Sequence, residues 1–234
     1  MQKYYIWERY TSKMFGKFKI KGNRAHLRSE EELVNVDKAE ADDAFKKYKQ
    51  TILDKYLAEK GFVKYKANAY VRKNKIDVLE YIDLQKERYG SKTFTVNYAI
   101  MPLYVPHDYL VTGFGSRLGK LICDKDIWWD YANDSIAQVS FQNVADAVER
   151  FVMPWFDKYA IEDVLMKKLM EDKKKREQTG MGIPYKNEEW ISSLKEDKAR
   201  ANIIGENIDR LKLPKKWNVP NSIPDIHLLD LSLK

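Results

Sequence analysis

The sequence has almost no cysteine: Cys123 is the only one in 234 residues, so no disulfide can form within the chain. Long apolar runs are absent too, since no stretch approaches the roughly 18 consecutive apolar residues that a membrane helix requires. The first ten residues, MQKYYIWERY, have neither a continuous apolar core nor a small-residue cleavage site, unlike a secretory signal. These absences predict a cytoplasmic protein without a membrane segment.

Patterns that bind metals or cofactors are also missing. The three histidines lie far apart, and none belongs to an HExxH or CxxC motif, so we expect no metal site. The GFG stretch at 113–115 is too short for a phosphate-binding loop and has no Lys-Ser/Thr after it. A lone cysteine such as Cys123 more often packs than reacts. We therefore predict no cofactor and assign no catalytic residue.

Composition predicts a folded protein with one unusual end. An apolar content of 44% and a charged content of 33% are typical of globular chains, and the length allows a sizeable core. The formal net charge of +7 is concentrated in residues 1–29, where eight Lys and Arg oppose one acid, Glu8. The same segment interleaves aromatic residues with the bases. It is either an extension whose aromatics pack on the main domain or a surface that tracks a nucleic-acid backbone and stacks on bases.

Residues 76–101 are the clearest structural signal. Apolar and polar residues alternate on both sides of the polar link 86–92, which predicts a β-hairpin. The pairing that we predict sets Leu84 opposite Phe94, Ile82 opposite Val96, Glu80 opposite Tyr98 and Val78 opposite Ile100. One face is then apolar apart from Glu80, and the other is polar. An acid on the apolar face needs a basic partner, for which Arg72 and Arg117 are the candidates.

Helical periodicity flanks this hairpin. Apolar stripes predict helices at 42–60 and 141–153, the second kinked or restarted at Pro154. Short strands are expected at 62–66 and 69–72. Further elements expected along the chain are a strand at 109–114, a strand or turn at 117–122, and a helical stretch from Ile161 that dissolves at 173–176.

Together these elements predict an α+β fold: a two-layer sandwich with a four- to five-stranded, mainly antiparallel sheet and helices on one face. We divide the chain into a basic aromatic N-terminal extension (1–41), an α+β core domain (42–160) and C-terminal helices with an extended tail (161–234). A helix is expected at 187–212, with Asn187 as a candidate cap. The final leucines alternate, so the tail could add a strand to its own sheet or to another subunit and form a homo-oligomer.

Several short motifs resemble a known bacterial family. They are KGFVKYKANAYVR at 60–72, IDLQK at 82–86, FTVN at 94–97, RLG at 117–119, WW at 128–129 and PWF at 154–156. This pattern resembles Domain of unknown function 4304 over residues 43–160, with Val63 where the family more often has Lys. The resemblance implies boundaries and a fold but no established activity.

The polar face of the hairpin is the best candidate for a binding site. Its candidate residues, with those that could border it, are Gln85, Asn97, Tyr81, Asp83, Thr95, Arg117, Trp128 and Trp129. Polar side chains on the solvent side of a sheet also occur without any function. The first hypothesis is nevertheless a non-enzymatic module that recognises a protein partner through this face or through the C-terminal helix and tail. Small bacterial α+β proteins that neutralise toxins, the immunity proteins, offer an analogy.

Two other hypotheses stay open. The first alternative is nucleic-acid binding by the basic strands 62–75 and by the N-terminal bases, namely Lys17, Lys19, Lys21, Arg24 and Arg28. The second is an enzyme of unknown reaction. It requires a pocket that unites Glu80 or Asp83 with Arg117, Cys123 or His107.

Overall fold

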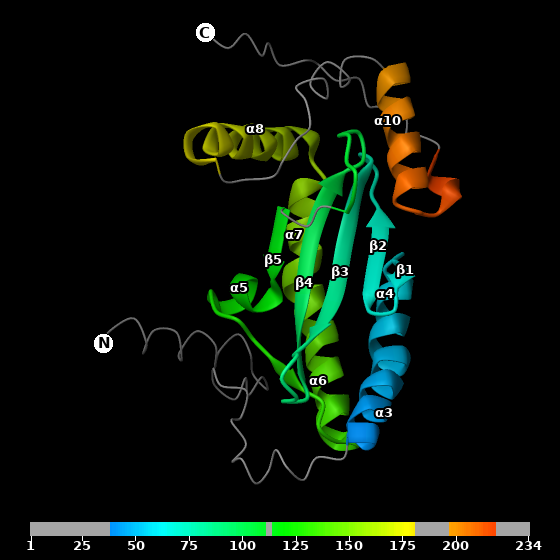
Figure 1. Cartoon of the computed structure of the whole chain (residues 1–234), viewed down its shortest axis with the longest axis vertical. Coiled ribbons are helices and arrows are strands. Elements are labelled where there is room, and N and C mark those ends of the chain that lie inside the picture. The colour runs from blue at the N-terminus through cyan, green and yellow to red at the C-terminus, as the bar shows by residue number, and fades with distance from the viewer. Residues whose placement is uncertain (1–37, 111–113, 181–196, 219–234) are drawn as a thin grey trace.

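An antiparallel sheet forms the centre of the computed structural model, which describes residues 38–110, 114–180 and 197–218. Its strands run in the order β1 (Val63–Lys66), β2 (Ala69–Lys73), β3 (Val78–Lys86), β4 (Thr93–Pro102) and β5 (Phe114–Arg117). A short sixth strand, β6 (Trp129–Asp130), pairs with the start of β4 beside β5. Long helices cover one face of this sheet (Figure 1), which confirms the predicted α+β class.

The central hairpin has the predicted faces but a different register. Leu84 pairs with Val96 instead of Phe94, and Glu80 pairs with Ile100 instead of Tyr98, a shift of two residues. The shift arises at the end of β3. Lys86, which was expected in the loop, belongs to β3 and takes the position opposite Phe94 that was predicted for Leu84. Its ammonium lies 4.0 Å from the ring centroid of Phe45 and 2.8 Å from the carboxylate of Asp42. A two-residue shift preserves the faces because side chains alternate with a period of two.

The two long helices each contain a π-helical segment. The first consists of α3 (Lys38–Tyr48), η1 (Lys49–Asp54) and α4 (Lys55–Glu59), and so begins four residues earlier than predicted. The second consists of α6 (Asp134–Ala147), η2 (Val148–Val152) and α7 (Met153–Tyr159).

The second helix begins seven residues before the predicted 141, because Asn133 caps it. The side chain of Asn133 accepts a hydrogen bond of 2.9 Å from the N–H of Ile136. The π-helical segment ends at Val152, two residues before Pro154. It changes the hydrogen-bond spacing at the point where proline lacks a donor and crowds the preceding turn. Helical structure therefore continues past the proline.

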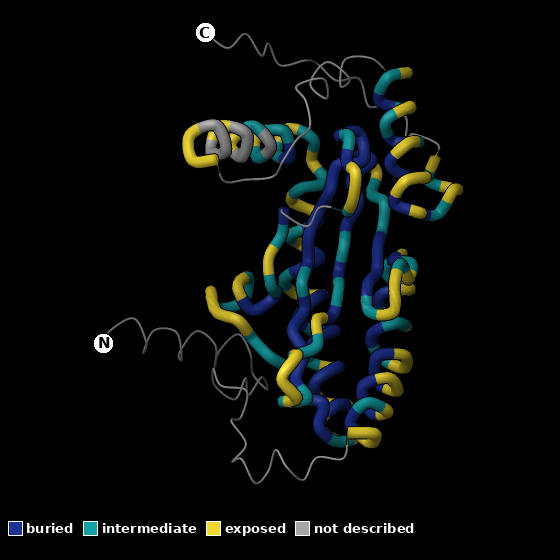
Figure 2. Tube along the Cα trace, viewed as in Figure 1, coloured by how far each residue is buried: buried dark blue, intermediate teal, exposed yellow. Residues whose placement is uncertain are grey.

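Phe94 joins both long helices to the sheet. Its ring lies 5.3 Å from the ring of Phe45 in α3 and 4.9 Å from the ring of Phe141 in α6, measured between centroids. Aromatic pairs at such distances add stabilisation beyond the area that they bury. The even-numbered side chains of β4 thus face the helices, as the alternation predicted. Figure 2 shows the strands as mostly buried and the outer side of α3 as exposed.

The chain after β4 differs from the expectations in two places. Residues 117–122 are neither a strand nor a turn: they belong mostly to a helix, α5 (Leu118–Cys123), and β5 begins at Phe114 where the predicted strand ends. The helix α8 (Glu162–Thr179) continues through the basic run 173–176 to Thr179. Basic residues near a helix C-terminus are favourable because they complement the partial negative charge of that end.

The C-terminal part contributes to the same core. Ile204 and Ile208 of α10 (Asp197–Arg210) and Leu165 of α8 belong to the hydrophobic cluster of the sheet. A short 3-10 helix, η3 (Lys215–Asn218), follows α10. Asn187 and the leucine-rich tail lie outside the described residues, as does the extension 1–37. No helix in the described ranges is long and apolar enough to cross a membrane.

Candidate functional site

The sheet face opposite the helices carries the predicted polar side chains of the hairpin. We call Tyr81, Asp83, Gln85, Thr95 and Asn97 the polar strip. Register places Asp83 opposite Asn97 and Gln85 opposite Thr95, so the strip runs across two adjacent strands. These residues lie on one face because odd-numbered positions of β3 and β4 point away from Phe94 and its helix contacts.

Asn97 links the two strands of the strip. Its side-chain amide nitrogen donates to a carboxylate oxygen of Asp83 at 3.2 Å and to the amide oxygen of Gln85 at 3.3 Å. Burial raises the pKa of Asp83 above its usual range, and the hydrogen bonds from Asn97 and Tyr81 oppose that shift. Burial also raises the pKa of Tyr81, and the neighbouring carboxylate of Asp83 adds to the effect. Cross-strand hydrogen bonds therefore fix several donors and acceptors on one rigid surface.

Thr95 differs from the rest of the strip because it is fully buried. Among the described residues, its hydroxyl has no hydrogen-bond partner. A buried hydroxyl without a partner lowers stability, commonly by about 1–3 kcal/mol. Thr95 therefore belongs to the floor of the strip, whereas Gln85 opposite it is exposed.

Arg117 and Trp128 form a corner beside the strip. Arg117 lies on β5 opposite Asn97, and its guanidinium donates to the carboxylate of Asp126 and stacks over the indole of Trp128, 5.4 Å from the ring centroid. Gly119 permits this arrangement, since a Cβ there would meet the backbone oxygen of Lys125 at 2.3 Å. The RLG motif thus brings the segment 125–127 against α5 and holds the corner together.

Trp129 does not border the strip. Its ring packs 6.2 Å from that of Phe94, on the side of the sheet that the helices cover. Successive residues of a strand point to opposite faces, so only one of the two adjacent tryptophans can reach the strip. We therefore leave Trp129 out of the candidate surface.

Glu80 forms the structural pair that the sequence required. Its carboxylate lies 2.5 Å from Nε of Arg72, and the amide of Asn74 donates to it at 3.3 Å. Burial raises the pKa of Glu80, and Arg72 opposes this effect. Glu80 and Asp83 point to opposite faces of β3. Cys123 Sγ contacts its own helix, 3.4 Å from the carbonyl oxygen of Gly119.

Sequence reasoning missed a buried polar network around α10. Arg200 of α10 donates to Glu162 at 3.1 Å and to the carbonyl of Ile76 at 3.3 Å, and its guanidinium stacks over Tyr104. Asn207 binds the segment that follows β4. These residues come from distant parts of the chain. Arg200 reaches the backbone beside Asp77, a residue that adopts a positive φ of 58°. Nothing in the local sequence pattern indicates these pairings.

Two further hypotheses from the sequence concern metal and nucleic-acid sites. The described residues contain no group of three or more His, Cys, Asp or Glu side chains that could hold a metal ion. Three bases of the strands 62–75 pair with acids: Lys64 with Asp54 at 3.2 Å, Arg72 with Glu80, and Lys73 with Asp77 at 2.7 Å. Lys17, Lys19, Lys21, Arg24 and Arg28 lie outside the described residues.

Comparison with known families identifies the central segment. Residues 53–158 match the model of a family described as Domain of unknown function (DUF4304), which confirms the resemblance over that segment. The match includes β1 to β6 and most of the second long helix, whereas α8 and α10 lie beyond it. No curated protein and no solved structure matches the chain.

Proposed function

We propose that this chain is a non-enzymatic binding module that recognises a protein partner through the polar strip and the Arg117–Trp128 corner. The hydrogen-bonded group of Asp83, Gln85 and Asn97 is the observation that carries the proposal. This group lies on the sheet face that α3, α6 and α7 leave open, and no described helix crosses its centre (Figure 1). We place the interaction in the cytoplasm, as the cysteine content suggests.

Rigidity and composition both favour this surface for recognition. Side chains that neighbouring strands already hold in place lose little conformational freedom when a partner binds. Arginine, tryptophan and tyrosine are also the residues most enriched at the energetically important points of protein interfaces. The strip and its corner contain all three, in Arg117, Trp128 and Tyr81.

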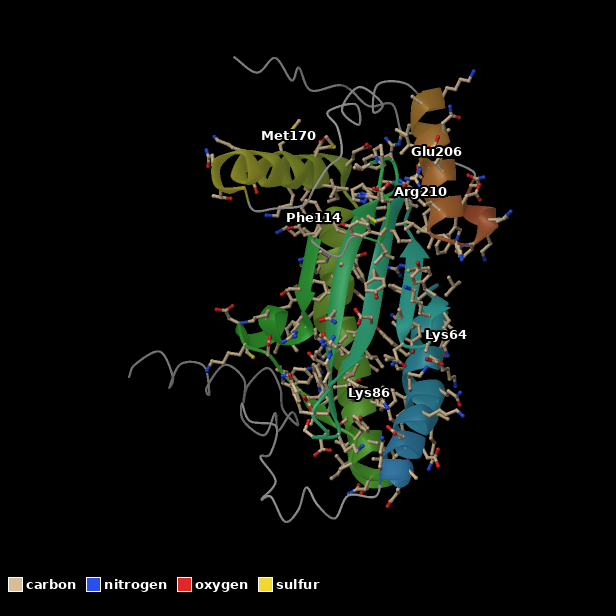
Figure 3. All side chains as sticks on the ribbon, in the orientation of Figure 1. Lys64, Lys86, Phe114, Met170, Glu206 and Arg210 are labelled. Carbon is tan, nitrogen blue, oxygen red and sulfur yellow. The ribbon has the colours of Figure 1, made fainter. Side chains whose placement is uncertain are left out.

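The inner side of α10 is less suitable as a recognition surface. Its polar side chains Arg200 and Asn207 point inward and bind the fold itself. Figure 3 shows α10 with Glu206 and Arg210 beside the upper end of the sheet. A partner could reach only the outward residues of this helix, so we favour the strip over the C-terminal helix.

A matched pair of variants tests the proposal. Gln85→Arg places a larger charged side chain on the strip, and Asn202→Arg makes a comparable change at an exposed position of α10. In affinity capture from the native host after nuclease treatment, we expect the wild type and N202R to retain the same protein and Q85R to lose it. Equal retention by Q85R would contradict the proposal.

Nucleic-acid binding is the alternative proposal, and it rests on the basic and aromatic residues of 1–29 together with the basic strands 62–75. The same capture distinguishes it, because nucleic acid would then be recovered without nuclease and no protein would survive the treatment. Binding through several phosphate contacts would also weaken steeply as the salt concentration rises.

A further inference from the structure

Asp83 differs from the two acids that precede it in the chain. Asp77 lies 2.7 Å from the ammonium of Lys73, and Glu80 lies 2.5 Å from Nε of Arg72. Asp83 forms no ion pair with any lysine, arginine or histidine of the described ranges. It is also the one acid of the three that stays partly exposed. The fold thus compensates the two buried acids and leaves the accessible one without a counter-charge.

The bases nearest to Asp83 on its face of the sheet are too far away to pair with it. Ala69 and Asn97 flank Asp83 on the neighbouring strands, and the next positions outward are Lys66 in β1 and Arg117 in β5. Both bases lie two strands away, which is about 10 Å. Burial raises the pKa of Asp83, and hydrogen bonds from its neighbours, not a base, oppose that shift.

The groups around Asp83 form a small surface rich in acceptors. One amide nitrogen of Asn97 donates to the carboxylate of Asp83 at 3.2 Å and to the amide oxygen of Gln85 at 3.3 Å, which holds these two acceptors side by side. Both acceptors can receive further donors, since a carboxylate offers about four lone-pair sites and an amide oxygen two. Thr95, opposite Gln85, is fully buried, and its hydroxyl has no partner among the described residues. Unsatisfied polar groups that occur together are typical of a site kept for a ligand.

We propose that Asp83 binds an arginine side chain of the protein partner. This inference rests on the proposed function and adds the chemistry of one contact. A guanidinium suits the site better than an ammonium, because it is planar and can donate to the carboxylate and to the neighbouring amide oxygen together. It also stacks on aromatic rings, and Tyr81 lies two positions from Asp83 on the same face. The partner then supplies the counter-charge that the fold lacks.

The first test needs only the chain itself. Asp83→Asn removes the charge but keeps an oxygen that accepts from Asn97. An acid retained for binding does not stabilise the free chain, so at pH 7 this variant should unfold at a urea concentration equal to or above that of the wild type. Glu80→Gln removes the charge of a paired acid and should unfold at a lower concentration. A lowered midpoint for Asp83→Asn would make Asp83 a structural acid and overturn the inference.

The second test measures binding. The protein retained in the capture experiment is purified and titrated into the wild type, Asp83→Asn and Asp209→Asn. Asp83→Asn should weaken binding about 30-fold or more, because the arginine is then left in the interface without its acid. Asp209→Asn is the matched control at an exposed position of α10 and should bind as the wild type does. Unchanged affinity of Asp83→Asn overturns the inference.

The arginine is then located in the partner. Each arginine and each lysine of its surface is replaced singly by glutamine, and every replacement is measured against both the wild type and Asp83→Asn. One arginine replacement should weaken binding as much as Asp83→Asn does, and the two losses should not add, because they remove the same contact. Coupling of Asp83 to a lysine, or to no residue of the partner, overturns the inference.

The possible results separate this inference from the proposed function. Loss of the partner by Gln85→Arg with unchanged binding by Asp83→Asn overturns only the arginine contact. Retention of the partner by both variants, or capture of no protein by the wild type, overturns both proposals. An arginine of residues 1–29 is the competing occupant. Tighter binding by the full chain with Arg9, Arg24 and Arg28 all changed to glutamine would show that this chain fills the site itself, and would overturn the inference.

Discussion

At the scale of single residues, Glu80 shows how the fold tolerates a charge on its apolar face. The side chain is 1% exposed and lies on the face of β3 that the helices cover. Arg72 supplies the opposite charge from the neighbouring strand, and its guanidinium also donates to the carbonyl of Lys60 at 2.7 Å. The pair therefore connects β2, β3 and the end of the first long helix.

Removal of this acid should destabilise the protein strongly. We expect Glu80→Ala to lower the free energy of unfolding by about 3 kcal/mol, because it leaves Arg72 partly buried without its partner. Glu80→Gln should cost less, since an amide oxygen still accepts from Arg72. Urea denaturation measures both, with the exposed Asp209→Ala as the control. A loss below about 1 kcal/mol for Glu80→Ala would show that the pair contributes little.

At the scale of elements, α10 is part of the folded unit although the family match ends before it. Asn207 satisfies backbone groups of the segment after β4 that would otherwise be buried without partners: the carbonyls of Leu103 and Val105 and the N–H of His107. Buried backbone groups require such partners. The helix thus stabilises the connection that leads to β5 and Arg117.

Asn207→Ala should loosen that connection. Three backbone groups lose their partner, so we expect a loss of about 2–4 kcal/mol in the free energy of unfolding. Hydrogen exchange should become faster in residues 103–108 and stay unchanged in the ladder between β3 and β4. Asn202→Ala, on the exposed side of the same helix, serves as the control. Equal exchange in residues 103–108 of both variants would contradict the role of Asn207.

At the scale of the whole molecule, the buried His107 connects folding stability to pH. Burial lowers the pKa of His107 from 6.5 to about 4, and the neighbouring Asp108 opposes this shift. Between these values the unfolded chain binds a proton that the folded chain does not. Stability is therefore present above pH 6.5 and is lost as the pH falls towards 4.

The predicted loss from this group is about 2 kcal/mol between pH 7 and pH 5. His107→Gln removes the titrating group, so its stability should fall less over the same interval. Chemical denaturation of both proteins at the two pH values measures the difference. An identical decrease in wild type and variant would assign the pH dependence to groups other than His107. Glu80 and Asp83 cannot be those groups, because their raised pKa values make the folded state more stable, relative to the unfolded state, as the pH falls.

Sequence periodicity predicted the faces of the hairpin but not its register. The apolar side of β4 and the polar strip follow from alternation, which a shift of two residues leaves unchanged. The position of Lys86 could not be read from the hairpin, because its partners Phe45 and Asp42 lie in α3. The same holds for the candidate site. Alternation predicted that Asp83, Gln85 and Asn97 share one face, but not which of them lie opposite each other.

The sequence by itself determined the α+β class, the two sheet faces and the need of Glu80 for a basic partner. Each follows from residues close together in the chain or from the chemistry of one side chain. The tertiary structure alone decided which tryptophan entered the core, that Thr95 is buried, and that Arg200 and Asn207 hold α10 on the sheet. Those outcomes depend on contacts between distant segments, about a hundred residues apart for Arg200 and Asn207, which local periodicity does not encode.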